Sequence, residues 1–551
     1  MKTQNPRTEL ATHNVLNQPP LPGDFNLFGD PALASAMGSG LAKLSQSGGP
    51  DDGLLEHTEH LSSFGKLAGS ARARDLGRLA SENKPTLKAF DARGRRIDEI
   101  EFHPAYHELM KMGLENGVSA RAWTAKSSGH MAHAALAYMM GWADTGVGCP
   151  MTMTYAVTPV LQNESWTHET WLKGVTSGHY DPACRPAQEK SGLTMGMAMT
   201  EKQGGSDLRA NTTKAVVGAD GEAELTGHKW FCSAPMCDGF LTLAYEDAGL
   251  SCFLVPKWRP DGTRNAMEIQ RLKDKMGDHS NASSEIEYRG AWAKRVGEPG
   301  RGIPTIITMA HHTRFDCIIG SASGMRKSVA LAAQFARHRT VFQKKLIDQP
   351  LMQNTLADLA LESEAALALG FAVAAGFDAP KNSHAHKLSR VLTPIAKYWV
   401  CKRQPNVVAE TMECLGGVGF VHESGMPRLF QTSPLNAIWE GSGNVIALDI
   451  QRALHSPDTM NAFNEEITRI GSDIPSVRSL TDWLKDATNV DARLFAERAA
   501  LIFAADALPP GPLRDAWIGL RITHPSHVWG ANAGTIDAPY LTGRLDGWHQ
   551  A

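Results

Sequence analysis

One carboxylate followed by small residues is the stretch of this 551-residue sequence best suited to chemistry. Glu440 stands directly before Gly441, Ser442, Gly443 and Asn444. Glycine lets a backbone approach a bulky ligand and adopt positive φ, and serine and asparagine add short hydrogen-bonding groups. Apolar residues flank the stretch and no cation is adjacent in sequence, so we expect burial to raise the pKa of Glu440 and make it a proton acceptor. The alternative is a glycine-rich helix start with a capping acid.

Three further stretches place glycine beside hydroxyl or aromatic side chains. Thr200 and Ser206 lie on either side of Gly204–Gly205, and hydroxyls together with glycine N–H groups suit phosphate oxygens. Residues 227–233 (GHKWFCS) read most simply as an ordinary buried strand. Residues 415–420 (LGGVGF) contain two consecutive glycines. Any one of these motifs is weak evidence by itself.

The pattern of the chain divides it into five parts. Residues 1–60 are rich in Pro, Gly, Asn and Ser and predict an arm that wanders or drapes over another surface. Residues 61–194 and 298–454 are helical in pattern, and the second range predicts a four-helix bundle. Residues 195–297 contain short strand-like runs separated by turn residues, which predict an all-β insert. Residues 455–551 begin helical and end rich in loops. The long helices expected in the bundle are 303–309, 321–337, 352–377 and 386–414.

Composition excludes several classes of protein. The net charge of −3 gives no overall basic footprint for nucleic acid. Eight cysteines without CxxC spacing predict neither a disulfide scaffold nor a thiolate metal site, and they fit a reducing compartment. We find neither a signal peptide nor an apolar run of about 18 residues, so we expect a cytoplasmic protein without a membrane span.

Two histidine pairs are candidates for a metal site. His103 and His107 are four residues apart, but Pro104 and the lack of a nearby third ligand favour capping or packing roles. The same holds for His311–His312. We therefore expect no metal.

The four motifs, in this order along residues 199–444, resemble those of the acyl-CoA dehydrogenase flavoprotein family. Met199–Asp207 is similar to the family signature T-E-x-x-x-G-S-D, and 227–233 is similar to the strand that lies along the flavin. The resemblance implies a mainly α fold with a β-barrel insert: an N-terminal helical domain, a middle β domain, a C-terminal four-helix bundle and, here, an extra C-terminal helical domain. It also implies FAD as cofactor and an acyl-CoA-type small molecule as substrate.

The resemblance assigns roles to individual residues. Ser206 would reach the cofactor pyrophosphate, Phe231 would stack on the flavin where most members have Trp, and Ser233 would lie near flavin N5 where most have Thr. Glu440 would remove the α proton of an acyl thioester while a β hydride passes to flavin N5. Some members carry the base on another helix, but the corresponding stretch here, near 319–325, contains no acid. The cofactor-binding residues implied are Met197, Met199, Thr200, Gly205, Ser206, Phe231, Cys232, Ser233, Arg339, Gly416, Gly417, Ile438, Trp439, Gly441, Ser442 and Asn444.

Some of these residues would act across a subunit boundary. By resemblance, Arg339 and Gly416–Gly417 meet the cofactor of a neighbouring subunit, which implies a homo-oligomer, in this family a tetramer. Glu413 and Gln343 depart from the residues that most members carry there. A carboxylate near a pyrophosphate repels it unless it is paired, so the details of this contact stay open.

The phrase Thr313–Cys317 and the length of the chain look closest to the branch of the family linked to the response to alkylating agents. That branch binds double-stranded DNA through its C-terminal domain and has only weak dehydrogenase activity. The alternative function is therefore a DNA-binding flavoprotein that protects DNA, with vestigial catalysis. Residues 455–551 carry eight Lys and Arg against twelve Asp and Glu, which disfavours it because duplex binding needs clustered cations. Arg452 matches an arginine of the family's DNA contact, or it forms a salt bridge at the end of the bundle.

Overall fold

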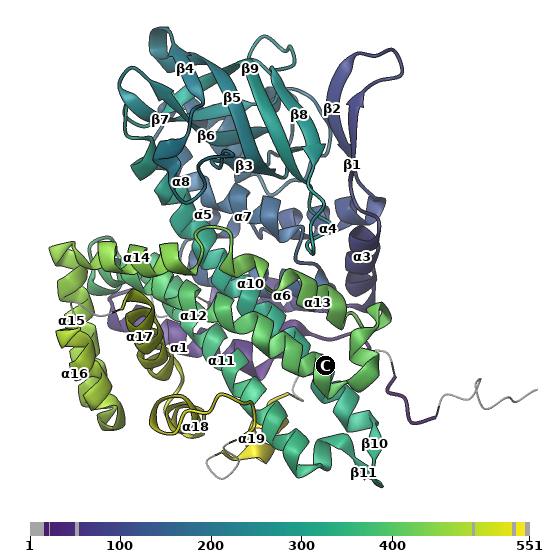
Figure 1. Cartoon of the computed structure of the whole chain (residues 1–551), viewed down its shortest axis with the longest axis vertical. Coiled ribbons are helices and arrows are strands. Elements are labelled where there is room, and N and C mark those ends of the chain that lie inside the picture. Colours follow the sequence, from purple (N-terminus) through teal and green to yellow (C-terminus); the bar gives the residue numbers. More distant parts are fainter. Residues whose placement is uncertain (1–15, 21, 50–53, 488–490, 532–535, 546–551) are drawn as a thin grey trace, which may run out of the picture.

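The computed structural model describes residues 16–545 except 21, 50–53, 488–490 and 532–535. Long helices form one end of the molecule, and a small β domain stands on them at the other end (Figure 1). The predicted fold, mainly helical with a β insert, is confirmed, and the arrangement puts α14 (Gly443–Leu454) and the upper half of α10 (Gly302–His338) beneath the β domain.

Short helices and one hairpin make up the N-terminal part. The hairpin was not predicted from the sequence. It packs against strand β8 (Met267–Leu272) of the β domain (Figure 1), where Arg96 donates to the carbonyl of Ile269 at 2.8 Å. The elements are α1 (Pro31–Gln46), α2 (Thr58–Ala68), α3 (Ala71–Glu82), β1 (Thr86–Phe90), β2 (Arg96–Glu101), α4 (Pro104–Glu115), α5 (Arg121–Thr124), α6 (Gly129–Ala143), α7 (Gly148–Ala156), α8 (Thr158–Gln162) and α9 (Lys173–Val175).

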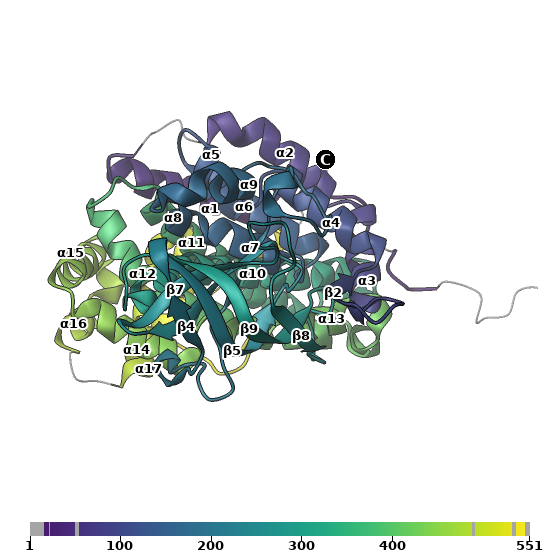
Figure 2. The same ribbon diagram turned by 90° about the horizontal axis from the view of Figure 1, so that it is seen from above.

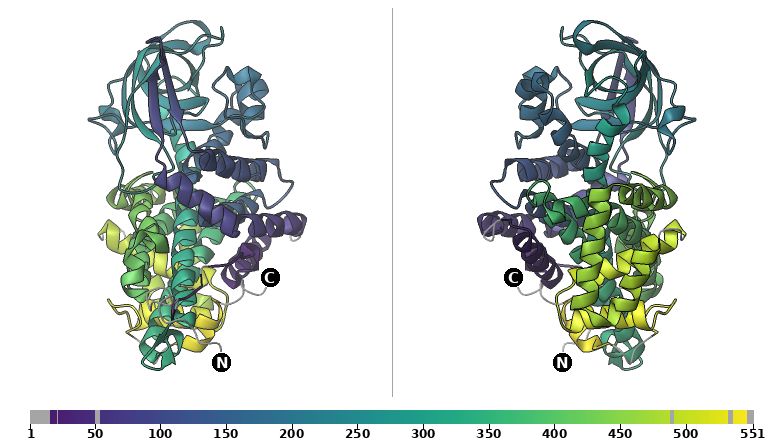
Figure 3. Two further views of the ribbon diagram at one scale, coloured as in Figure 1. Left: turned by 90° about the vertical axis from the view of Figure 1, so that its right-hand side faces the viewer. Right: turned by 90° about the vertical axis from the view of Figure 1, so that its left-hand side faces the viewer.

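The stretch expected to be an arm that wanders or drapes over another surface contains helix α1, which packs against the long helices, so residues 31–46 do not wander. Asp30 caps the helix by accepting from the Ala32 N–H at 3.0 Å, and Pro31 fits the first turn because its missing N–H would be unpaired there. Asp30 also forms a fully buried ion pair with Arg326 of α10 at 2.7 Å. Figure 3 shows these N-terminal helices along one side of the molecule.

The β domain is a barrel-like sheet of seven strands. The strand order is β3-β6-β4-β5-β9-β7, β7 returns to pair with β6, and β8 pairs with β9. Figure 2, seen from above, shows these strands over the helices. The strands are β3 (Met195–Ala198), β4 (Lys214–Val217), β5 (Glu222–Ser233), β6 (Gly239–Glu246), β7 (Gly249–Pro256), β8 (Met267–Leu272) and β9 (Ser283–Val296).

The bundle is built on three long helices. The two helices predicted at 303–309 and 321–337 are one continuous helix, because the linking residues 310–320 contain no proline and bury one face. The fourth partner is α14, which packs on α12. The elements are α10 (Gly302–His338), β10 (Thr340–Val341), β11 (Lys344–Lys345), α11 (Pro350–Asp378), α12 (His384–Cys414), α13 (Met426–Thr432) and α14 (Gly443–Leu454).

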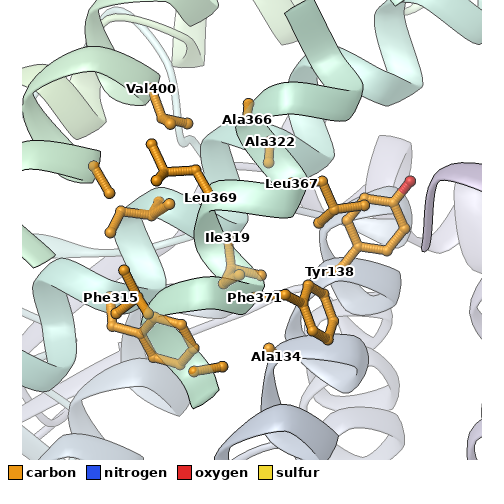
Figure 4. Close-up of a cluster of buried hydrophobic side chains, with 14 of the residues drawn as sticks. Ala134, Tyr138, Phe315, Ile319, Ala322, Ala366, Leu367, Leu369, Phe371 and Val400 are labelled. Carbon is orange, nitrogen blue, oxygen red and sulfur yellow. The ribbon is translucent and has the colours of Figure 1, made fainter. Parts of the chain in front are cut away.

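Helix α11 is long and apolar enough to cross a membrane, which corrects the expectation that no such run exists. Its apolar window is 94% buried inside the protein. It is therefore the core helix of the bundle. In Figure 4 its residues Leu367 and Phe371 lie beside Ile319 of α10 and Tyr138 of α6.

Buried ion pairs join the extra C-terminal region to this core helix. Arg521 pairs with Asp358 at 2.6 Å and Glu362 at 2.8 Å, and Arg544 pairs with Glu364 at 2.6 Å. All three carboxylates belong to α11. The helices of this region are α15 (Pro457–Asp473), α16 (Arg478–Asp486), α17 (Ala492–Ala507), α18 (Pro512–Trp517), a π-helix (Ile518–Thr523) and α19 (Ala538–Gly543).

Candidate active site

Glu440 lies in a left-handed backbone conformation just before α14. Its φ is +58°, a region that costs a residue with a side chain about 1 to 3 kcal/mol. Two cations hold the segment in place. Lys397 donates to the carbonyls of Trp439 and Gly441, both at 2.8 Å, and Arg314 donates to the carbonyl of Glu440 at 3.0 Å. Three consecutive carbonyls are thus fixed by charged donors.

The carboxylate of Glu440 has a neutral partner. Thr313 of α10 donates its hydroxyl proton to Oε2 at 2.5 Å. Burial raises the pKa of Glu440 above its usual value, while the Thr313 hydrogen bond and the charges of Lys397 and Arg314 oppose the rise. The direction of the pKa shift is the one predicted, and Glu440 itself is half-buried. The capping alternative is not seen, because α14 starts after Ser442 and Glu440 turns to Thr313.

The α10 residue that contacts the Glu440 carboxylate is Thr313, which is not an acid. Glu440 is therefore the carboxylate of this contact.

Arg314 is anchored from behind by a buried carboxylate. Asp449 of α14 accepts from Arg314 at 2.8 Å and from Arg390 of α12 at 3.2 Å. Burial opposes ionisation of Asp449, but the charges and hydrogen bonds of these two arginines hold its pKa below the usual value. Asp449 and its two arginines thus link α14, α10 and α12 beneath the Glu440 segment. Neither Arg314 nor Asp449 was singled out from the sequence.

The other residues predicted around Glu440 are half-buried or exposed. The Trp439 indole donates to Asn436 at 2.8 Å, which fixes the ring. Ile438 is 63% exposed although it is aliphatic. Ser442 forms no capping bond through its side chain, and Asn444 is exposed.

The β domain presents the remaining predicted residues on two adjoining segments. Phe231 of β5 is 48% exposed, whereas the next residue, Cys232, is fully buried. A half-exposed aromatic ring is suited to stacking on a planar ligand, and here the Lys273 ammonium lies over the ring, 4.6 Å from its centroid. Thr200 is joined to β5 through a backbone bond from Trp230 at 2.8 Å. Met197 is buried, Met199, Thr200 and Ser233 are half-buried, and Gly205 and Ser206 are exposed on the loop after β3.

A buried ion pair that the sequence did not flag holds these two segments together. Glu201 and Lys229 are fully buried and lie 2.8 Å apart. Burial opposes ionisation of Glu201, but Lys229 and the donors Thr213 and Thr212 outweigh it and lower its pKa to about 2. Both residues stand inside motifs quoted from the sequence, yet nothing local shows that they meet. They fix the loop that carries Thr200 and Ser206 against the strand that bears Phe231.

Three predicted cofactor residues lie away from Glu440 within one chain. Arg339 leads into β10, which Figure 1 shows at the end of the helices opposite the β domain. Its guanidinium donates to the carbonyl of Asn17 at 2.8 Å. Gly416 and Gly417 are exposed at the end of α12. The structure therefore does not bring these three residues to the Glu440 site of the same chain.

The histidine pairs have structural roles. The His103 ring accepts from the Ala105 N–H at 3.1 Å and caps α4, while His107 bonds the Tyr180 hydroxyl at 2.8 Å. His311 and His312 pack against Phe377. The predicted capping and packing roles are confirmed. Within the part of the chain that the structure describes, no group of three His, Cys, Asp or Glu could hold a metal ion.

Most cations of the C-terminal region are engaged inside the protein. Arg469 pairs with Glu466 and Asp506, and Arg521 and Arg544 pair with α11 as described above. Arg498 stacks on Trp483 at 4.1 Å. Arg452, the predicted DNA contact, is exposed at the end of α14, and among the described residues it makes no ion pair. The salt-bridge alternative for Arg452 is thus not seen.

Comparison with known proteins agrees with this geometry. Residues 17–182 match the adaptive response protein AidB N-terminal domain, 196–291 the acyl-CoA dehydrogenase middle domain, and 300–455 the acyl-CoA dehydrogenase C-terminal domain. The chain is 43% identical over 448 residues to AidB of Escherichia coli K12, with 81% of each chain covered. The chain belongs to the acyl-CoA dehydrogenase family. The predicted family, its AidB-like branch and FAD as cofactor are confirmed.

Other members of the acyl-CoA dehydrogenase family share the whole fold. Acyl-CoA dehydrogenase family member 11 of Caenorhabditis elegans is 28% identical over 487 residues, which cover 84% of this chain and 77% of that protein. The crystal structure of C. elegans ACDH-11 with C11-CoA superimposes with a TM-score of 0.81 at 23% identity, covering 99% of this chain and 95% of that one. An acyl-CoA dehydrogenase from Bacillus anthracis complexed with FAD gives 0.66 at 16% identity, with 90% and 88% covered. Both superpositions show the fold.

Proposed function

We propose that this protein is an FAD-dependent acyl-CoA dehydrogenase-like oxidoreductase that removes two hydrogens from the α and β carbons of an acyl thioester. The observation that carries the proposal is Glu440: a half-buried carboxylate with a raised pKa and one neutral donor, Thr313. A raised pKa makes the carboxylate a stronger proton acceptor than an exposed one. Glu440 takes the α proton as the C–H bond breaks, and the electron pair forms the double bond.

The backbone at the same residue suits the thioester carbonyl. Among the hydrogen bonds of the described residues, the N–H of Glu440 donates to no protein acceptor. Lys397 and Arg314 fix the carbonyls on both sides of it, so this N–H is held still. A fixed donor aimed at a developing oxyanion stabilises the transition state more than the ground state. We assign the Glu440 N–H to polarisation of the carbonyl beside the acidified carbon.

The residues of the β domain fit a flavin dinucleotide. The open ring of Phe231 suits stacking on the tricyclic ring, and exposed Gly205 and Ser206 offer N–H and hydroxyl donors for phosphate. The Glu201–Lys229 pair keeps these elements in register. When bound there, FAD supplies an acceptor for the hydride of the β carbon. Residues of this chain bind and orient the FAD, and they hold the Glu440 carboxylate on the opposite side of the substrate.

The acyl substrate is expected to carry coenzyme A, in line with the C11-CoA bound by the C. elegans relative. Anaerobic titration of the FAD-loaded protein with acyl-CoAs of increasing chain length tests this. We expect at least one of them to bleach the flavin absorbance. The dehydrogenase proposal fails if none does.

Replacement of the base tests the role of Glu440 itself. We expect Glu440→Gln to keep FAD bound and to abolish flavin reduction, because an amide cannot accept the proton at this position. Glu59→Gln, an exposed residue of α2, is the matched control and should reduce like the wild type. Reduction at the normal rate in Glu440→Gln would place the base elsewhere.

We also propose a homotetramer in which neighbouring chains complete each cofactor site. The support is apolar surface beside Arg339 and Gly416: Phe342 is 89% exposed, and Leu351 and Phe420 are each 81% exposed. Exposed side chains of this kind favour a protein partner. Light scattering should give four chains for the wild type and a smaller assembly for Phe420→Lys. A monomeric wild type at micromolar concentration would contradict the proposal.

A further inference from the structure

A short hairpin, β10 and β11, follows the C-terminal end of α10 and lies at the end of the molecule away from the β domain (Figure 1). Each strand has two residues, and Phe342 and Gln343 form the turn between them. Both turn residues have positive φ, +49° and +67°, a conformation that suits asparagine and glycine and is unfavourable for bulkier side chains. A hairpin of this size is marginally stable by itself. Contacts from outside the hairpin therefore hold its shape.

The side chain of Asn17 supplies two of these contacts. The register pairs Val341 with Lys344 next to the turn, so the N–H and C=O of Thr340 point away from β11. Asn17 meets both groups: its Oδ1 accepts from the Thr340 N–H, and its Nδ2 donates to the Thr340 carbonyl, each at 2.7 Å. One amide side chain thus takes the place that a neighbouring strand would occupy.

The backbone of Asn17 is suited to this contact. Its φ is +55°, in the left-handed region that asparagine adopts more readily than most residues with a side chain. Its own carbonyl accepts from Arg339 at 2.8 Å, so Asn17 is joined to the residue before the hairpin as well as to β10. These bonds link positions 322 and 323 residues apart in the sequence, so they are tertiary contacts between the N-terminal segment and the hairpin.

The chain that follows Asn17 is itself held in place. Residues 19–20 are two consecutive prolines, which fix two φ angles and stiffen the segment. Further along, the carbonyls of Pro22 and Gly23 accept from Arg74 of α3 at 2.8 Å and 2.5 Å. Asn17 is therefore carried on a segment anchored to the N-terminal helices, and the hairpin is braced against that part of the molecule.

The brace leaves the tip of the hairpin open. Phe342 at the tip is largely exposed, whereas Asn17 occupies the outer edge of β10 at Thr340. An open strand edge can pair with another exposed edge, and an exposed apolar side chain favours a complementary protein surface. The hairpin thus presents its apolar tip to a partner and keeps its strand edge closed.

We propose that Asn17 is a positioning residue for the interface between copies of this chain. It holds the hairpin in the form in which Phe342 reaches a second copy. The occupant is a second copy because the tetramer proposed above buries this tip together with the other exposed apolar side chains. The inference rests on that proposed assembly and is independent of the dehydrogenase reaction.

The test compares Asn17→Gly with the wild type in the full-length protein, by light scattering over a dilution series and by hydrogen–deuterium exchange. Glycine keeps the left-handed backbone and removes both amide bonds. We expect the concentration at which the assembly dissociates to rise about tenfold, as for the loss of two exposed hydrogen bonds. The Thr340 N–H should exchange about tenfold faster, because it loses its acceptor.

Two further variants separate the side chain of Asn17 from general effects of the substitution. Asn17→Asp can still accept from Thr340 but cannot donate, so its assembly should dissociate at a concentration between those of the wild type and the glycine variant. Asn382→Gly is the matched control, because Asn382 is also exposed with a φ of +65°, and its side chain makes no hydrogen bond within the described part of the chain. This control should assemble like the wild type.

Three results would overturn the inference. Equal dissociation of Asn17→Gly and wild type would show that the hairpin reaches the second copy without Asn17. The same weakening in Asn382→Gly would assign the loss to glycine in an exposed turn. Weaker assembly with unchanged Thr340 exchange would show that Asn17 does not act through the hairpin. A monomeric wild type would instead remove the tetramer itself, and failure of the dehydrogenase proposal would appear separately, as tight FAD binding without reduction by any acyl-CoA.

Discussion

Thr313→Val removes the hydroxyl that donates to the Glu440 carboxylate and that also lies 3.1 Å from the carbonyl of Ala310. Valine keeps the shape of threonine, and Thr313 is 2% exposed, so the change removes a donor with little change in packing. A hydrogen bond to a charged group contributes about 1.5 to 3 kcal/mol. Its loss raises the pKa of Glu440 further, because the bond favours the ionised form.

The effect on the reaction depends on pH. Glu440 must be ionised to accept a proton, so activity is lost as the pH falls through its pKa. In Thr313→Val this loss begins at higher pH. Well below the pKa, the ionised fraction and the rate fall by about tenfold to hundredfold, since each 1.4 kcal/mol is about tenfold. Well above it, the two proteins converge, because both carboxylates are ionised.

The assay is the rate of flavin reduction by an acyl-CoA substrate in stopped flow across pH, with Thr313→Ser as the control that keeps the hydroxyl. We expect the serine variant to follow the wild type and the valine variant to show its acid limb at higher pH. An acid limb at the same pH in all three proteins would refute the argument that Thr313 stabilises the ionised base. A uniform loss at every pH would instead indicate misplacement of the carboxylate.

Two further predictions concern the ion pair beneath the cofactor segments and the charge of the C-terminal region. Glu201→Gln should lower the free energy of unfolding by about 3 to 5 kcal/mol and weaken FAD binding, because it leaves Lys229 buried without its partner. Glu201→Gln combined with Lys229→Met should recover part of the stability in urea unfolding, and a double variant worse than the single one would contradict this. The pKa of Glu201, lowered to about 2 from 4.5, means that its contribution to stability is present above pH 4.5 and is lost as the pH falls towards 2, which urea unfolding between pH 2 and 7 can follow. We expect only weak binding of duplex DNA at physiological salt, reduced further in Arg452→Ala. Tight binding that does not depend on ionic strength would show that exposed cations such as Arg452 do not hold the DNA.

The sequence was sufficient to predict which types of residue form the site. Glycines around Glu440 and Ser206, an aromatic residue in a strand, and a switch from helical to alternating pattern each have a local physical cause. Those local signals predicted the helical and β parts and the acid with a raised pKa, whereas the cofactor was implied by the resemblance of the four motifs to the acyl-CoA dehydrogenase family. They did not reveal helix α1 inside the stretch expected to be an arm, although Asp30 and Pro31 form a helix start.

The tertiary structure decided which side chains meet. The approach of Thr313 to Glu440, of Lys397 to the carbonyls on both sides, and of Glu201 to Lys229 joins elements 28 to 127 residues apart. Local sequence carries no record of these distances, because the packing of α10, α12 and α14 sets the first two and the folding of the β domain sets the third. The same holds for Asn17, an unremarkable asparagine in the sequence that folding carries to the edge of β10. Residue type fixes what chemistry is available, and only the packed chain fixes which groups are close enough to share it.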